Sequence, residues 1–415
     1  MPLPPLEPLP GIVSQHYEEA AFLWTQRRRA IHAPHYTLVD LERLDERMEA
    51  HLDGLRIAGP AAWARAEETL ADEEPGEAFA ATVLALCDSL PTRLAPVLEL
   101  AQASERCAQE LVSALGWSPL PQVAPILEEL QRRQEPTLRR VGLAALAVHR
   151  GEVGKALAQA LSGEEPQLRT RALRAVGELG RLELLPLARP FLSSKDERCR
   201  LAAAWTCALL GESVALPHLR ALAEAGGPGS TVAVDMAVRR MERHAARSWL
   251  IALAEKSEHR RLILQGCAAL GDIYFIPWVL ERMEEPRLAR VAGEAFRFLT
   301  GADLSEPPFA GECPEGFEDE EDESLRLDAD DDLPWPAPAA VHAWWAQHRQ
   351  DFHPEARYLL GRPVTPETLL EALRHGRQRE RKAAALEWAL RRPGKPLFEV
   401  RAPGFRQRRL LASMG

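Results

Sequence analysis

Hydrophobic residues recur along most of this chain at spacings of three and four, as on the stripe Leu168, Ala172, Val176 and Leu179. That spacing places them on one face of an amphipathic helix. No useful length of the chain alternates between apolar and polar residues, so sheet is predicted to be minor at most. Outside the centre, the pattern predicts helices at about 12–32, 37–56, 366–375 and 379–391, and one around Trp344 and Trp345.

A short motif returns in the central part of the chain. Glu-Pro-x-Leu begins at Glu135, Glu165 and Glu285. Proline suits the first turn of a helix, and an acidic residue there interacts favourably with the positive end of the helix dipole. Each helix of this phase ends near a glycine, which is expected to supply a left-handed cap. These glycines are Gly151, Gly180, Gly211, Gly271 and Gly301.

The same central region shows how its helices should pack. Small residues recur at one phase of the second helix of the unit, and they predict close approach to neighbouring helices: Gly142, Ala172, Ala202 and Ala292. A single unit cannot bury its apolar stripe, so stacked units must supply the core. The predicted units are 60–90, 91–117, 118–151, 152–181, 182–211, 212–245, 246–271 and 272–301. In the unit 212–245, Met241 stands where a cap glycine is expected.

Two helices in about 30 residues with short turns resemble a HEAT repeat. We therefore expect an all-α fold, an α-solenoid of HEAT-like helix pairs with a helical cap at each end. The predicted organisation is an N-terminal helical cap at 1–58, the repeat solenoid at 59–304, an acidic Pro-rich loop at 305–338, and a C-terminal helical cap and tail at 339–415. The tail after Pro396 is predicted to be extended.

Charge is concentrated in two segments. The chain carries a net charge of −10, and residues 312–332 contain twelve acidic residues against Arg326, so the remainder is near neutral. From residue 354 onward, basic residues outnumber acidic ones. Apolar residues are spaced through the acidic region: Phe317, Leu325, Leu327, Leu333 and Trp335. They favour a latch in which part of 317–335 folds back onto the protein and shields a partner surface. A solvated tether remains the alternative.

Five arginines stand near the starts of successive second helices: Arg140, Arg171, Arg200, Arg261 and Arg290. Equivalent positions of a solenoid line up as a ridge, usually on the inner face. The arginines either pair with acids of the next repeat and hold the stack together, or bind an acidic partner. With Trp335 they form the predicted partner-binding set.

The sequence lacks the common catalytic motifs. It has no G-x-S-x-G, no P-loop lysine motif and no dinucleotide-binding glycine fingerprint. It also has no His-Glu dipeptide, which the iron-binding hydroxylases built on similar repeats carry. We therefore predict no catalytic residues, no cofactor and no metal ligands.

Two alternative functions remain open. A metal-dependent enzyme would use the histidines and aspartates of the N-terminal segment: His16, His32, His35, His51, Asp45 and Asp53. No helical His pair at i, i+4 is present, so packing or capping roles are favoured for these histidines. A nucleic-acid binder would use the basic stretch 377–382, which lacks interleaved aromatic residues.

The sequence also indicates a location. No apolar run approaches the roughly 20 residues of a membrane span, and residues 1–6 lack the basic and apolar regions of a secretory signal. The six cysteines form no C-x-x-C pair, which suits a reducing compartment. A cytoplasmic protein is expected.

Several segments near the two ends resemble one poorly characterised bacterial HEAT-repeat family. The matching segments are 15–24, 33–36, 44–47, 50–55, 344–345, 357–363, 376–379 and 402–407. Members of that family have no established catalytic residues and tend to be encoded near type VI secretion components, including proteins similar to spike-tip and adaptor proteins. The resemblance implies a non-enzymatic protein-binding scaffold or adaptor that helps to load or hold a secreted effector. Its expected partner is another protein, with neither membrane nor nucleic acid expected.

Overall fold

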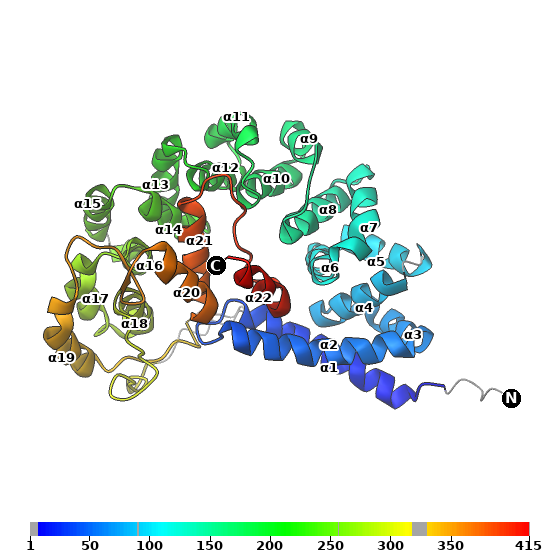
Figure 1. The fold of residues 1–415 in the computed structure, drawn as a ribbon, viewed down its shortest axis with the longest axis horizontal. Helices are drawn as coiled ribbons and strands as arrows, with labels where there is room; N and C mark the ends of the chain where they lie inside the picture. Colours follow the sequence, from blue (N-terminus) through cyan, green and yellow to red (C-terminus); the bar gives the residue numbers. More distant parts are fainter. Residues whose placement is uncertain (1–6, 89–90, 256, 318–329, 415) are drawn as a thin grey trace. The chain divides into compact units, whose positions relative to one another are not determined.

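The chain folds as an all-α solenoid of helix pairs, as the periodicity predicted (Figure 1). The computed structural model describes residues 7–88, 91–255, 257–317 and 330–414. Strand in this described part is confined to one short antiparallel hairpin, β1 (Tyr358–Leu359) with β2 (Arg362–Pro363). Contacts divide the chain into two compact units. Unit 1 comprises residues 1–32, 36–179 and 399–415, and unit 2 comprises 33–35 and 180–398.

Unit 1 begins with two long helices and continues as helix pairs. Thr37 opens the second long helix with a capping box, in which its side chain and that of Asp40 satisfy each other's backbone N–H groups. The long helices are α1 (Pro10–Ala30) and α2 (Leu38–Ala58). The pairs are α3 (Pro60–Thr69) with α4 (Pro75–Asp88), α5 (Pro91–Ala103) with α6 (Glu105–Trp117), α7 (Leu120–Arg132) with α8 (Pro136–His149), and α9 (Ala156–Ser162) with α10 (Pro166–Glu178).

Unit 2 continues the pairing and adds the C-terminal helices. Its first helices are often short and preceded by a 3₁₀ turn, and Pro186, Pro217 and Pro277 each lie in the first turn, as predicted. The pairs are α11 (Leu185–Ala188) with α12 (Glu197–Leu209), α13 (Leu216–Glu224) with α14 (Ser230–Arg240), α15 (Arg243–Ala254) with α16 (Arg260–Leu270), and α17 (Ile276–Arg282) with α18 (Pro286–Thr300). Then follow α19 (Pro338–His348), α20 (Pro366–His375) and α21 (Gln378–Leu390).

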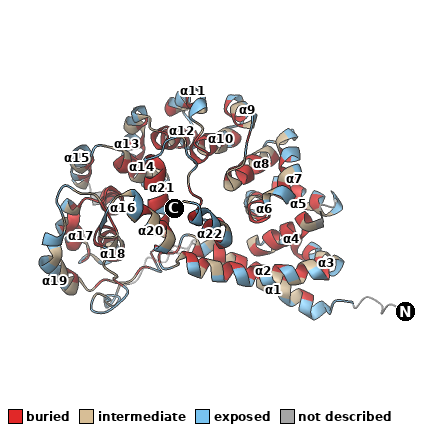
Figure 2. Cartoon of the chain, in the orientation of Figure 1, coloured by how far each residue is buried: buried red, intermediate tan, exposed pale blue. Residues whose placement is uncertain are grey.

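The second helix of each pair carries most of the core, as Figure 2 shows for α10 and α12. The predicted small positions lie in this core: Ala172 and Ala292 are fully buried, and a Cβ added at Gly142 would meet Leu130 Cβ at 2.9 Å. Neighbouring helices therefore approach closely where the sequence has glycine or alanine.

Most of the predicted glycine caps are left-handed. Gly180, Gly211, Gly271 and Gly301 all have positive φ. The expectation for Gly151 was wrong, because Arg150 takes the left-handed position at the end of α8, with φ 55°. Arg150 lies one residue nearer the helix, where its own N–H can reach the carbonyl of Ala147 at 3.1 Å.

In unit 2 the C-terminal part of the chain packs directly on two of these caps. Tyr358 N–H donates to the carbonyl of Gly271 at 2.7 Å, and Leu360 N–H donates to the carbonyl of Phe298 at 2.6 Å. Arg357 Nε donates to the carbonyl of Leu270 at 2.8 Å. The carbonyls that a helix end leaves unpaired are thus satisfied by residues far along the chain.

A buried ion-pair cluster fastens α21 to α14. Glu387 of α21 accepts from Arg239 at 3.0 Å and from Arg357 at 2.5 Å. The side chains of Arg239 and Glu387 are only 4% and 3% exposed, so each charge needs the other.

Two boundary predictions were wrong. The unit boundary placed after residue 245 falls inside α15, which begins at Arg243 because Glu242 caps it through the N–H groups of His244 and Ala245. The tail after Pro396 was predicted to be extended, but Gly404–Ala412 forms helix α22 in unit 1. The domain boundaries at 58, 304 and 338 stay predictions.

We predict that Gly271→Ala destabilises the protein by about 3 kcal/mol, because the left-handed φ and a clash add together. The new Cβ would lie 2.3 Å from the carbonyl oxygen of Tyr358. Gly226→Ala is the matched control, since Gly226 also has positive φ but its Cβ would meet nothing closer than 3.9 Å. That control should cost about 1 kcal/mol. Urea unfolding measures both, and equal losses would contradict the close approach.

Candidate partner-binding surface

In unit 1, both predicted arginines lie near the starts of their helices and have partners within the unit. Arg140 of α8 makes a two-pronged ion pair with Glu105, the first residue of α6, at 2.6 and 2.9 Å. Arg171 of α10 donates to Glu178 of the same helix at 2.8 Å. The Arg140 pair joins the second helices of consecutive units, which is the stacking role that the sequence left open.

In unit 2, the predicted set divides into two kinds. Arg200 of α12 donates to the carbonyl of Ser194, in the turn that precedes α12, at 2.7 Å. Arg261 of α16 and Arg290 of α18 instead hold carboxylates from a distant segment, Asp330 at 2.6 Å and Asp331 at 3.4 Å. The structure therefore brings Arg261, Arg290 and Trp335 together in unit 2. Whether the six predicted residues bind a partner stays a prediction.

We call residues 330–336 the acidic strap. Its Asp330 and Leu333 are 4% and 6% exposed, so the strap is seated on the unit and is not merely solvated. The Arg290 guanidinium lies 5.0 Å from the centre of the Trp335 ring, and the Phe317 ring meets the same indole edge-on at 5.3 Å. Leu325 and Leu327 of the predicted latch lie outside the described residues.

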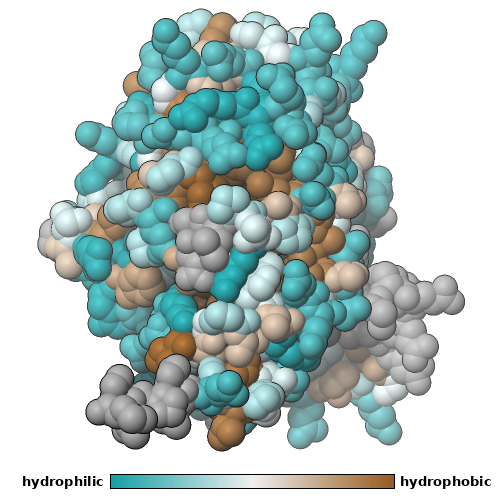
Figure 3. Space-filling model, turned by 90° about the vertical axis from the view of Figure 1, so that its right-hand side faces the viewer, coloured by the Kyte–Doolittle hydropathy of each residue, from teal (hydrophilic) through white to brown (hydrophobic). Residues whose placement is uncertain are grey.

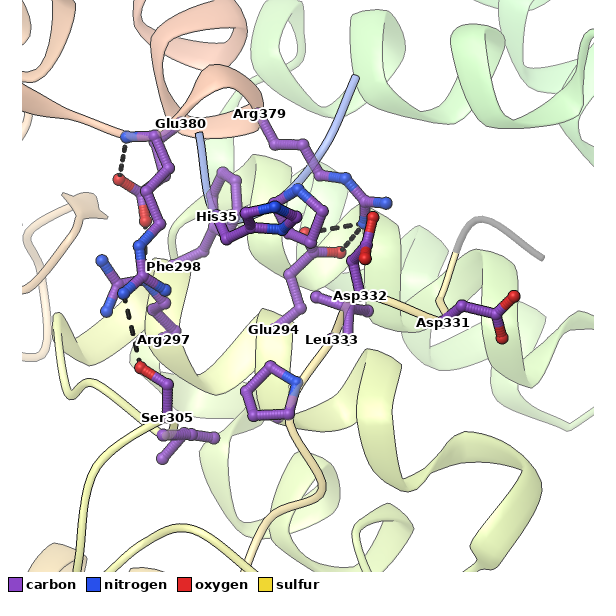
Figure 4. Close-up of a pocket in the computed structure, with 15 residues that line it drawn as sticks. His35, Glu294, Arg297, Phe298, Ser305, Asp331, Asp332, Leu333, Arg379 and Glu380 are labelled. Carbon is purple, nitrogen blue, oxygen red and sulfur yellow. Dashed lines mark hydrogen bonds and ion pairs between the residues drawn. The ribbon is translucent and has the colours of Figure 1, made fainter. Parts of the chain in front are cut away.

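A pocket of about 200 Å³ opens beside the strap, lined by α18, the start of α21, the strap and the segment 33–35 (Figure 4). Glu294 and Arg379 point toward one another there, with Nη1 2.9 and 3.0 Å from the two carboxylate oxygens. Arg297 donates to Glu380 at 2.6 Å. Burial raises the pKa of Glu294 above its usual value, against the opposing charge of Arg379. The pocket walls are thus held by ion pairs of the framework itself.

The motifs at the two ends of the chain meet in unit 1, which sequence reasoning missed. Arg27 of α1 pairs with Asp45 of α2 at 2.6 Å, and both side chains are 3% exposed. Arg27 also donates to the carbonyls of Arg401 and Ala402, while Asp45 accepts from Gly404 N–H at 2.7 Å. Only the occurrence of unusual motifs at both ends hinted at this contact. These residues hold the C-terminal tail in place.

An aromatic cluster and a second ion-pair group complete the seat of the tail. Trp24 stacks on Phe79 with ring centres 3.6 Å apart, and the guanidinium of Arg27 lies 5.0 Å from the Trp117 ring. Glu399 accepts from Arg401 at 2.8 and 2.9 Å and lies 3.4 Å from Arg150. Burial opposes the charged carboxylate, but Arg401 and Arg150 outweigh it and hold the pKa of Glu399 well below its usual range.

The residues of the two alternative functions have structural partners. His16 and His51 face each other with their Nδ1 atoms 3.1 Å apart, while Asp53 pairs with Arg56. Within the described residues, no three His, Cys, Asp or Glu side chains are grouped so that they could hold a metal ion. In the basic stretch 377–382, three arginines are engaged inside unit 2. Arg377 pairs with Asp303, Arg379 pairs with Glu294, and Arg381 is fully buried.

The repeat geometry agrees with a comparison against protein families. Residues 154–232 match the family model described as HEAT repeats. This part of the chain is therefore similar to HEAT repeats. No curated protein matches it, and no solved structure matches it. HEAT repeats commonly serve as scaffolds for protein–protein interaction and typically do not themselves catalyse reactions.

One face of the protein is mainly polar. Figure 3 shows a face that is mostly hydrophilic, with hydrophobic side chains in separate patches. The described helices include none that is long and apolar enough to pass through a bilayer.

We predict that Glu399→Gln lowers the free energy of unfolding at pH 7 by about 2 kcal/mol, because two arginines lose their carboxylate. A carboxylate whose pKa is lower in the folded than in the unfolded state stabilises the folded protein at pH values above the unfolded pKa, about 4.3 for glutamate. This contribution decreases as the pH falls below that value. The difference in stability between the wild type and the variant should therefore shrink progressively as the pH falls below about 4, toward the depressed pKa of Glu399 in the folded state. Urea titrations at pH 7 and in acid measure this.

Glu128→Gln is the control for that measurement. Glu128 is 67% exposed and pairs only across one helical turn with Arg132, so its loss should change stability by less than about 0.5 kcal/mol at either pH. A Glu399→Gln variant as stable as the wild type at pH 7 would contradict the role of the ion pair.

Proposed function

We propose that this protein is a non-enzymatic, cytoplasmic scaffold or adaptor whose inner arginines bind an acidic segment of another protein. The observation that supports this most directly is the pairing of Arg261 with Asp330 and of Arg290 with Asp331. These arginines stand at equivalent positions of consecutive HEAT repeats, and here they already hold an acidic segment of their own chain. The resemblance to the secretion-associated family supports a more specific role, the loading of a type VI effector.

The chemistry of the site suits such a partner. A guanidinium binds a carboxylate through two N–H groups and also stacks on an aromatic ring, as Arg290 does on Trp335. The Arg290 side chain is only 10% exposed, so leaving it without a carboxylate would be costly. An acidic partner would meet two partly desolvated cations at repeat spacing, and such contacts provide both affinity and register.

The test is capture of partners from the native host with mass spectrometry. Arg261→Glu with Arg290→Glu should reduce the amount of specific partner at least about tenfold, because reversing a charge turns attraction into repulsion. Arg261→Gln with Arg290→Gln removes the charge with less disturbance and should give a smaller loss in the same direction. Recovered type VI effectors or adaptors would support the specific role.

The matched control reverses two charges elsewhere in unit 2. Arg189 lies in the 3₁₀ turn that follows α11, and Arg220 lies on α13; their side chains are 51% and 46% exposed. Arg189→Glu with Arg220→Glu should leave capture unchanged, while circular dichroism checks the fold of every variant. Equal loss in this control, or full capture by both variants of Arg261 and Arg290, would contradict the proposal.

A further inference from the structure

The acidic strap occupies the surface that the proposed function assigns to a partner. Its contacts follow a short pattern: Asp330 on Arg261, Asp331 on Arg290, Leu333 buried against the unit, and Trp335 against the guanidinium of Arg290. In sequence this is Asp-Asp-x-Leu-x-Trp. Two charged contacts and two apolar contacts within six residues are typical of a short peptide seated on a repeat surface.

The strap is fixed at one end. Gly311 N–H donates to the carbonyl of Trp335 and Ala337 N–H donates to the carbonyl of Phe309, both at 2.7 Å. Segments 309–311 and 335–337 thus form a neck that ties the strap to its own chain. Through this tether, Asp330 and Asp331 are held at a high effective concentration beside their arginines.

The source of the carboxylate distinguishes the strap contacts from the framework pairs. Arg379 of α21 has its carboxylate partner, Glu294, on α18, so both members of that pair belong to the helical framework. Asp330 and Asp331 instead come from a connecting segment whose described residues, 301–317 and 330–337, form no helix or strand. An exchange of the strap for another acidic peptide would leave every helix of unit 2 in place.

We propose that the acidic strap is an intramolecular ligand of the partner site, and that the true partner presents a similar segment. The segment carries two adjacent acidic residues, an apolar residue two positions after them, and an aromatic residue two positions further. The partner's segment binds Arg261 and Arg290 in place of the strap. Because the strap competes for these arginines, it lowers the affinity of the site for weaker acidic peptides. This inference rests on the proposed function and adds the chemistry of the partner and a competitor to it.

The experiment measures binding of a fluorescein-labelled synthetic peptide with the sequence of residues 328–336 to the full-length protein by fluorescence anisotropy. The wild type should bind it weakly, because the tethered strap competes. Asp330→Asn with Asp331→Asn weakens the strap without changing its shape, and affinity for the peptide should rise at least about tenfold. Adding Leu333→Ala should raise it further.

Two controls make the result specific. Asp332→Asn changes an exposed acid of the same strap and should leave the affinity at the wild-type value. Arg261→Gln with Arg290→Gln, added to the strap variant, should remove the gain. A labelled peptide with Asn at positions 330 and 331 should fail to bind any variant.

The outcomes separate this inference from the proposed function. A gain in the strap variant that disappears with the arginines supports the inference. Equal affinity of wild type and strap variant, or binding that survives the loss of both arginines, overturns it. If the peptide fails while partner capture from the host still depends on Arg261 and Arg290, the proposed function stands and the strap is not its ligand.

Discussion

Glycine in the left-handed conformation at the helix ends is the constraint on which much of unit 2 depends. At Gly271 and Gly301 a side chain would collide with the backbone of residues 358–361, so only glycine lets the C-terminal segment come this close. That approach lets Tyr358 and Leu360 use carbonyls that the helix ends leave unpaired. A glycine at these positions thus ends its helix and also allows residues 358–361 to pack against that helix end.

Buried ion pairs then fasten the docked segments. In unit 2, Glu387 joins Arg239 and Arg357, and in unit 1, Asp45 joins Arg27 and the backbone of Gly404. Such pairs add little net stability over apolar contacts, but they penalise any register that leaves one charge unpaired. The end motifs that support the family resemblance lie partly in these pairs. They therefore serve the architecture and are not by themselves evidence of a catalytic site.

The arginines of the repeats show how a scaffold and a binding site can share one feature. Arg140 joins neighbouring repeats, whereas Arg261 and Arg290 hold the acidic strap. The difference lies in the source of the carboxylate, a helix in the first case and a connecting segment in the second. A carboxylate from a helix is part of the framework. A carboxylate from a connecting segment can be exchanged, and this makes unit 2 the more attractive place for a partner.

The sequence by itself determined the class of fold and the position of nearly every helix pair, because periodicity, proline and glycine act over a few residues. It also placed the arginines at equivalent helix positions. The sequence prediction was wrong by a few residues at two helix ends. Glu242 caps α15 so that this helix starts earlier than predicted, and Arg150 takes the left-handed position predicted for Gly151. Only the tertiary structure decided that Asp45 meets Gly404 and that Asp330 meets Arg261, since each pair is separated by long stretches of chain. Ion pairing has no sequence period, so its partners become known only when packing brings them together.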